Sequence, residues 1–68
     1  MNSNELSKAL VALLHSLDCR KEAMMIILSL LTTEKERISL VYWISKHQQA
    51  TEEQVIAAAE IIKQKSSS

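Results

Sequence analysis

The chain has 68 residues, eight of them basic and eight acidic, with no glycine, no proline and one cysteine. Matched charge argues against nonspecific attraction to nucleic acid or to anionic membranes, and a single cysteine excludes a disulfide within the chain. Glycine and proline supply the turns of sheet proteins, so their absence predicts an all-α fold. We expect one helical domain at residues 1–65 and a disordered serine tail at 66–68.

The first predicted helix starts at Asn2 or Ser3 and carries a stripe of leucines. Asn2 and Glu5 have the spacing of a capping box, in which each side chain bonds to the other residue's backbone N–H. Five leucines follow at spacings that place them on one helical face, namely Leu6, Leu10, Leu13, Leu14 and Leu17. The N-terminus lacks the basic and apolar blocks of a secretory signal, which predicts a cytoplasmic protein.

The boundary between the first two helices is predicted at Ser16 to Asp18. Asp18 is expected to cap a second helix that runs from about Cys19 to Leu31. No glycine or proline enforces this break. The alternative is one long helix in place of two, which would leave three helices in the bundle.

The second helix contains the most apolar stretch of the chain, Ala23 to Leu31, in which only Ser29 is polar. Nine helical residues reach about 14 Å, whereas a bilayer core is about 30 Å thick, so this stretch is too short to span a membrane. A helix that is apolar all round must be covered on several sides. The cover comes from its own chain, from a second copy or from another protein.

Two further capping boxes mark the starts of the third and fourth helices. Thr33 pairs with Glu36, and Thr51 pairs with Gln54. The third helix is apolar over more than half of its circumference and carries the aromatic pair. The fourth is amphipathic and is expected to fray between Lys63 and Lys65. Four short helices joined by short polar turns predict a small compact bundle.

Side chains with catalytic or metal-binding chemistry are few. His15 and Cys19 lie four residues apart, but a structural zinc site needs four ligands. Cys19 precedes Arg20 and Lys21 near a helix start, which favours a lowered thiol pKa. The chain nevertheless has no glycine-rich oxyanion turn and too little mass to surround a substrate. We therefore expect no enzyme activity, no metal, no cofactor and no small-molecule substrate.

The last two helices have the outline of a helix-turn-helix, which gives an alternative function as a DNA-associated transcriptional regulator. The reading helix would begin with Glu52 and Glu53, whose carboxylates repel phosphates. Gln54 has the side chain to read adenine, and Lys63 and Lys65 suit phosphate contacts. Nucleic acid is therefore the less favoured partner. Tertiary packing would strengthen it by gathering basic residues, namely Lys35, Arg37, Lys46 and Lys63.

The function that we favour is non-enzymatic protein–protein association, as a homodimer or as a regulatory or adaptor subunit. Leu, Ile and Val number 19 in a chain this short, and the second and third helices are apolar on too many sides for one small core. Pairing two copies would cover that surface symmetrically. The candidate interface residues are Met24, Met25, Ile27, Leu28, Leu31, Leu40, Tyr42, Trp43 and Ile44.

Overall fold

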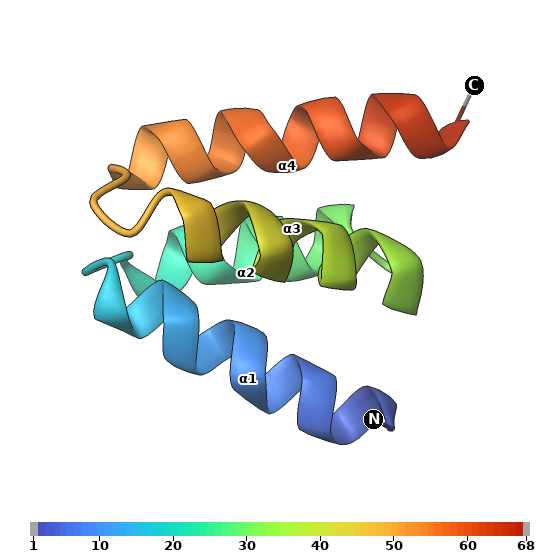
Figure 1. The fold of residues 1–68 in the computed structure, drawn as a ribbon, viewed down its shortest axis with the longest axis horizontal. Coiled ribbons are helices and arrows are strands. Elements are labelled where there is room, and N and C mark those ends of the chain that lie inside the picture. The colour runs from blue at the N-terminus through green and yellow to red at the C-terminus, as the bar shows by residue number, and fades with distance from the viewer. Residues whose placement is uncertain (1, 68) are drawn as a thin grey trace.

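A computed structural model describes residues 2–67, which form four helices (Figure 1). No strand occurs within these residues, so the all-α prediction is confirmed. The helices are α1 (Ser3–Ser16), α2 (Lys21–Leu30), α3 (Glu34–Lys46) and α4 (Glu52–Ser67).

The four helices surround one core. α3 packs against both α1 and α4, and α2 packs against α4. In Figure 1, α1 and α3 run in one direction and α2 and α4 in the other. The Cα radius of gyration is 10.7 Å, close to the about 11 Å that a compact domain of this length has. One copy of the chain therefore reaches ordinary compactness by itself, and dimerisation stays a prediction.

The break between α1 and α2 is made by Asp18, whose φ of 59° lies in the left-handed region. The Asp18 N–H donates to the His15 carbonyl at 3.0 Å, and the Cys19 N–H donates to the Leu14 carbonyl at 3.0 Å. This pair of bonds is a Schellman motif, which satisfies carbonyls that a helix end leaves without partners. The predicted break is confirmed, and the three-helix alternative is wrong.

The predicted cap of α2 is wrong in detail. α2 begins at Lys21, two residues later than expected, and its N-cap residue is Arg20, which makes no side-chain cap. Asp18 instead occupies the αL position that ends α1. Aspartate tolerates this conformation better than most residues because its short polar side chain bonds locally. The same residue type serves either end of a helix, so sequence alone did not separate the two roles.

The predicted caps of α1 and α4 are present. The Asn2 side chain accepts from the Glu5 N–H at 2.9 Å. Thr51 and Gln54 form the reciprocal capping box, with the Thr51 N–H donating to Gln54 Oε1 at 2.8 Å and the Gln54 N–H donating to Thr51 Oγ1 at 3.2 Å. These side chains satisfy N–H groups at the first turns, which no carbonyl within the helix reaches.

The core draws side chains from every helix of the described chain. Three leucines of the α1 stripe are buried, and Leu13 and Leu17 are half-buried beside them. The amphipathic face predicted for α4 also points inward. The buried apolar residues are Leu6, Leu10, Leu14, Cys19, Ala23, Met24, Ile27, Leu31, Leu40, Ile44, Val55, Ala58 and Ala59.

The side chain of Arg37 joins three helices. Its Nε donates to the Leu31 carbonyl at 2.7 Å and its Nη2 to the Leu28 carbonyl at 3.0 Å, both at the end of α2. Its Nη1 donates to the hydroxyl of Ser7 on α1 at 2.7 Å. A guanidinium suits this position because it carries several donors and a positive charge at the negative end of α2.

A second polar contact joins the starts of α2 and α4. Glu52 Oε1 accepts from the Arg20 backbone N–H at 2.7 Å, and Glu52 Oε2 accepts from Arg20 Nη2 at 3.0 Å. These hydrogen bonds hold the pKa of Glu52 below its usual range. The first turn of α4 is therefore held against the first turn of α2.

The end of α4 differs from the prediction. The helix does not end at Lys63 to Lys65 but continues to Ser67, so residues 66 and 67 are helical. Disorder of the serine tail stays a prediction. Residue 68 lies outside the described residues. The Ser66 hydroxyl donates to the carboxylate of Glu36 on α3, a contact between distant segments that composition alone does not reveal.

The apolar run of α2 is covered on only part of its circumference. Ala23, Met24 and Ile27 are buried, whereas Met25 is 63% exposed and Ile26 is 51% exposed. Within residues 2–67, no helix combines the length and the apolar character needed to cross a membrane. The expectation that α2 is covered on several sides is therefore met only in part by its own chain.

Candidate functional site

Five of the nine predicted interface residues belong to the core of this chain. They are Met24, Ile27, Leu31, Leu40 and Ile44, each 7% exposed or less. Their side chains pack on the other helices of the same chain. Their assignment to an interface stays a prediction.

The other four predicted interface residues reach the surface. Met25 on α2 is 63% exposed and Tyr42 on α3 is 61% exposed. Leu28 and Trp43 are half-buried at the edge of the core. The structure does not gather these four into one patch, because α2 and α3 do not pack closely on each other.

Three exposed isoleucines were missed by the sequence reasoning. Ile26 on α2, Ile38 on α3 and Ile61 on α4 are each more than half exposed. Ile38 lies one turn before Tyr42, so the two form an apolar stripe on the outer side of α3. Apolar periodicity did not single out this side, since a helix that is apolar over most of its circumference gives no sign of which side faces solvent.

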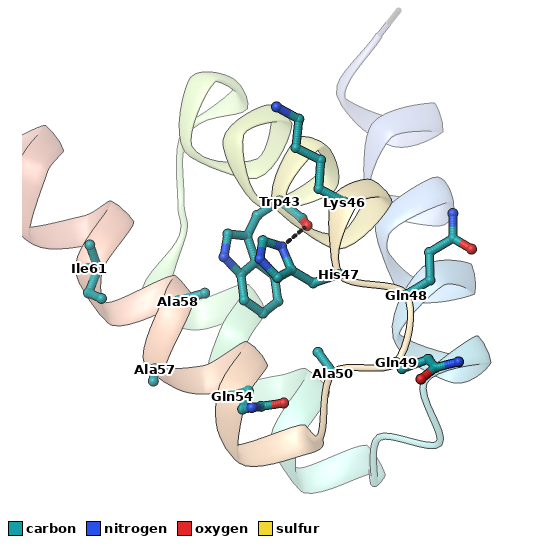
Figure 2. Close-up of a pocket in the computed structure, with 10 residues that line it drawn as sticks. All are labelled: Trp43, Lys46, His47, Gln48, Gln49, Ala50, Gln54, Ala57, Ala58 and Ile61. Atoms are coloured by element: carbon teal, nitrogen blue, oxygen red, sulfur yellow. Dashed lines mark hydrogen bonds between the residues drawn. The ribbon is translucent and has the colours of Figure 1, made fainter.

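Two hollows lie between α3 and α4, and we call them together the α3–α4 groove. The first, the Trp43 hollow, has a volume of about 610 Å³ and lies where the connection leaves α3 (Figure 2). Its lining on α4 is apolar except for Gln54, and the lining on α3 and the connection is mixed. The lining residues are Trp43, Lys46, His47, Gln48, Gln49, Ala50, Gln54, Ala57, Ala58 and Ile61.

Stacked rings of Trp43 and His47 form one wall of this hollow. Their centroids are 4.2 Å apart and their planes differ by 13°. His47 Nδ1 lies 2.8 Å from the Trp43 carbonyl oxygen, within hydrogen-bonding distance, and this contact orients the imidazole. Figure 2 shows both rings between α3 and the first turns of α4. The wall is a rigid, largely apolar surface of the kind found at the centres of interfaces.

The second hollow, the Lys63 hollow, lies between the start of α3 and the end of α4 and has a volume of about 840 Å³. Ser39 of this hollow and Trp43 of the first lie one turn apart on α3, so the two hollows follow each other along the same pair of helices. The lining residues are Thr33, Lys35, Glu36, Ser39, Ile62, Lys63, Lys65, Ser66 and Ser67.

Glu36 lies in the lining of the Lys63 hollow and is only 2% exposed. Its carboxylate accepts from the Thr33 N–H at 3.0 Å and from the Thr33 hydroxyl at 2.9 Å, and the Thr33 hydroxyl accepts from the Glu36 N–H, which completes the predicted capping box. Ser66 also donates to it, and Lys63 Nζ lies 3.4 Å away. The hydrogen bonds from Ser66 and Thr33 lower the pKa of Glu36 to about 2.

The groove concentrates positive charge in a chain that is neutral overall. Four of the eight basic residues line it, but only one of the eight acidic residues does, the buried Glu36. Lys46 Nζ lies 4.4 Å from the centre of the Tyr42 ring, a cation–π contact that links the groove to the outer stripe of α3. The basic residues are Lys35, Lys46, Lys63 and Lys65.

The thiol of Cys19 is not activated, contrary to the hypothesis drawn from its basic neighbours. Cys19 is 6% exposed, and burial, followed by the charges of Glu52 and Asp18, raises its pKa. Arg20 does not offset these effects, since its guanidinium is engaged by Glu52. Among residues 2–67, no three His, Cys, Asp or Glu side chains are grouped as metal ligands.

The start of α4 bears on the helix-turn-helix alternative. A reading helix places its N-terminal residues in the major groove of DNA. Here Glu52 is bonded to Arg20, so the first turn of α4 faces α2. Arg37, one of the four residues expected to form a basic surface, is engaged by α2 carbonyls, whereas the other three line the α3–α4 groove.

Three comparisons with known proteins were made, and no family model, curated protein or solved structure matches this chain.

Proposed function

We propose that this chain is a cytoplasmic, non-enzymatic protein that acts by protein–protein association, as a homodimer or as a regulatory or adaptor subunit. The observation that carries the proposal is the exposure of large apolar side chains. Such side chains are costly to leave in water. Two of them, Ile38 and Tyr42, lie one turn apart on α3, and adjoining exposed apolar area is typical of interaction sites. The residues are Met25, Ile26, Ile38, Tyr42 and Ile61, each between 51% and 63% exposed.

The homodimer form of the proposal uses the outer stripe of α3. Ile38 and Tyr42 lie on the same side of the helix, and the two-fold axis of a dimer would bring the same stripe from each copy together. Association would then be linked to folding, because a partner that binds only the folded chain stabilises it. The thermal midpoint should therefore rise with protein concentration.

A pair of substitutions tests this form. We expect the wild-type chain to sediment at twice its 7.7 kDa mass at tens of micromolar, and the Ile38→Ser, Tyr42→Ser variant to sediment as a monomer with unchanged helical content. Ser39→Ala on the same helix is the matched control and should stay dimeric. A compact monomeric wild type with a concentration-independent midpoint would eliminate the homodimer and leave a different protein as the partner.

The gathering of lysines along the α3–α4 groove supports a second candidate, a DNA-associated regulator. Lys35, Lys46 and Lys63 line hollows between the same two helices although they are distant in sequence. Gel mobility shift with duplex DNA at about 50 mM salt tests this candidate, since contacts with phosphates are strongest at low salt. We expect no shift at micromolar protein. A shift there would favour the DNA-associated regulator over the association module.

A further inference from the structure

We infer that the α3–α4 groove binds one amphipathic helix with acidic flanks, contributed by another protein. The inference rests on the proposed function, which is protein–protein association. It adds the surface that binds and the kind of partner that is bound. It is carried by three properties of the groove: its shape, its apolar lining and its uneven charge.

The shape suits a helix. The groove follows α3, which has 13 residues, and α4, which has 16, and so extends over about 20 Å. A partner helix of about 14 residues has the same length. Ala57 and Ala58 form part of the wall on α4, and their small side chains leave room for another backbone to approach. An extended peptide has no sheet edge to extend in residues 2–67.

The lining suits an apolar stripe on that helix. Ile61 is 53% exposed and faces the same hollow as the Trp43 ring. His47 covers one face of that ring, which leaves its edge and the alanines of α4 as the contact surface. In Figure 2, Ile61, Ala58 and the stacked rings surround the same opening. Helices that bind in such grooves present apolar side chains at i, i+3 or i+4, and i+7.

The charge selects acidic flanks. Lys35 and Lys46 stand at the two ends of the groove on α3, and Lys63 and Lys65 line it on α4. The carboxylate of Glu36 offsets the charge of Lys63, whose Nζ lies 3.4 Å from it, so the attraction for a partner rests on Lys35 and Lys46. Acidic side chains beside the apolar stripe would be attracted, and basic ones would be repelled.

A second copy of the chain matches the groove less well. One exposed apolar pair on its own helices is Met25 and Ile26 on α2. The first turn of that helix carries Lys21 as well as Glu22, so it offers no purely acidic flank. The phosphates of duplex DNA would attract the lysines, but Ile61 and Ala57 would then lie against the polar sugar–phosphate backbone. Charge and apolar surface together therefore favour the acidic helix.

The test uses synthetic peptides of about 14 residues and the fluorescence of Trp43, the only tryptophan in the chain. The first peptide has leucine at i, i+4, i+7 and i+11 with glutamate on both flanks. The second replaces each glutamate with lysine, and the third replaces each leucine with serine. We expect saturable changes in Trp43 emission with the first peptide and none with the other two.

Substitutions in the protein locate the binding site. The Lys35→Glu, Lys46→Glu variant should bind the acidic peptide about tenfold more weakly, because two attractions become repulsions. Lys8 is exposed on α1, and Lys8→Glu makes the same change of charge per site. This variant should bind the acidic peptide as tightly as the wild type does. Ala57→Phe should block the groove without disturbing the core, since Ala57 is exposed, and it adds no second tryptophan. Helical content by circular dichroism verifies that each variant is folded.

Several results would overturn the inference. The first two are equal binding of the acidic and basic peptides, and no response of Trp43 emission to any peptide. The other two are an equal loss of affinity for the acidic peptide in the Lys8 and groove variants, and displacement of that peptide by duplex DNA. If the wild-type chain dimerises through the Ile38 and Tyr42 stripe while no peptide binds, the groove inference fails and the proposed function stands. A monomer that binds no peptide excludes both the groove inference and the homodimer.

Discussion

Replacement of Arg37 by methionine is expected to destabilise the fold more than any other exchange of a basic residue. Methionine keeps the length and the apolar stem of the side chain but removes its donors. The carbonyls of Leu28 and Leu31 at the end of α2 and the hydroxyl of Ser7 on α1 then lose their partner. The end of α2 is also left without a compensating positive charge.

The size of the effect follows from those contacts. A hydrogen bond from a charged donor contributes about 1.5 to 3 kcal/mol. Arg37 makes two such hydrogen bonds to carbonyls. Because Arg37 is half-buried, water competes for these bonds, and the lower end of the energy range applies. We therefore expect a loss of about 3 kcal/mol in the free energy of unfolding. A chain of this length has a total of about 3 to 10 kcal/mol, so the variant would be marginally folded.

Urea unfolding followed by far-UV circular dichroism measures the loss, with Lys35→Met on the same helix as control. The control should cost less than about 0.5 kcal/mol because Lys35 is exposed. Ser7→Ala removes only the third hydrogen bond and should cost about 1 kcal/mol. A loss below about 1 kcal/mol for Arg37→Met, or a loss equal to that of the control, would show that Arg37 does not hold α1, α2 and α3 together.

Four other changes have defined outcomes. Thr51→Ala should lower the free energy of unfolding by about 1 kcal/mol and Thr51→Ser by little, whereas equal urea midpoints for Thr51→Ala and wild type would mean that Thr51 does not cap α4. Because the pKa of Glu36 is lowered from 4.5 to about 2, its ionised form stabilises the fold above the ordinary value, and that contribution is lost as the pH falls from 4.5 toward 2. Glu36→Gln should therefore be less stable at neutral pH and should lose less stability than wild type on acidification, and parallel pH curves would contradict the lowered pKa. Cys19 should react with a thiol reagent only slowly in the folded chain and quickly in urea, because it is buried and its pKa is raised. Asp18→Gly should raise the free energy of unfolding by about 0.5 to 1 kcal/mol by relieving a φ of 59°, and a loss of stability there would mean that the aspartate side chain is needed.

Local signals predicted the helices well. Asn2, Thr33 and Thr51 each cap the helix that they precede, because a capping bond involves residues only three apart in sequence. The break after α1 was placed correctly for the same reason, although Asp18 acts on the helix before it and not on the one after it. Contacts within one turn of the chain can be predicted from their residues alone.

Contacts between distant segments could not be predicted in this way. The groove depends on which sides of α3 and α4 meet, and both helices offer more than one apolar side. Nothing in the sequence therefore indicated that Ile38 and Ile61 lie at the surface. Ser66, assigned to a tail, bonds to Glu36 some thirty positions away. The gathering of lysines along the groove has the same origin, since net charge says nothing about where charges lie.

Sedimentation velocity of the full chain at tens of micromolar, alone and with an equimolar acidic amphipathic peptide, tests most directly whether the chain acts by association. We predict a species heavier than the 7.7 kDa monomer in at least one of the two samples. It would have twice the chain mass if the α3 stripe pairs two copies, or the mass of chain plus peptide if the groove is filled. A 7.7 kDa monomer in both samples would contradict the account.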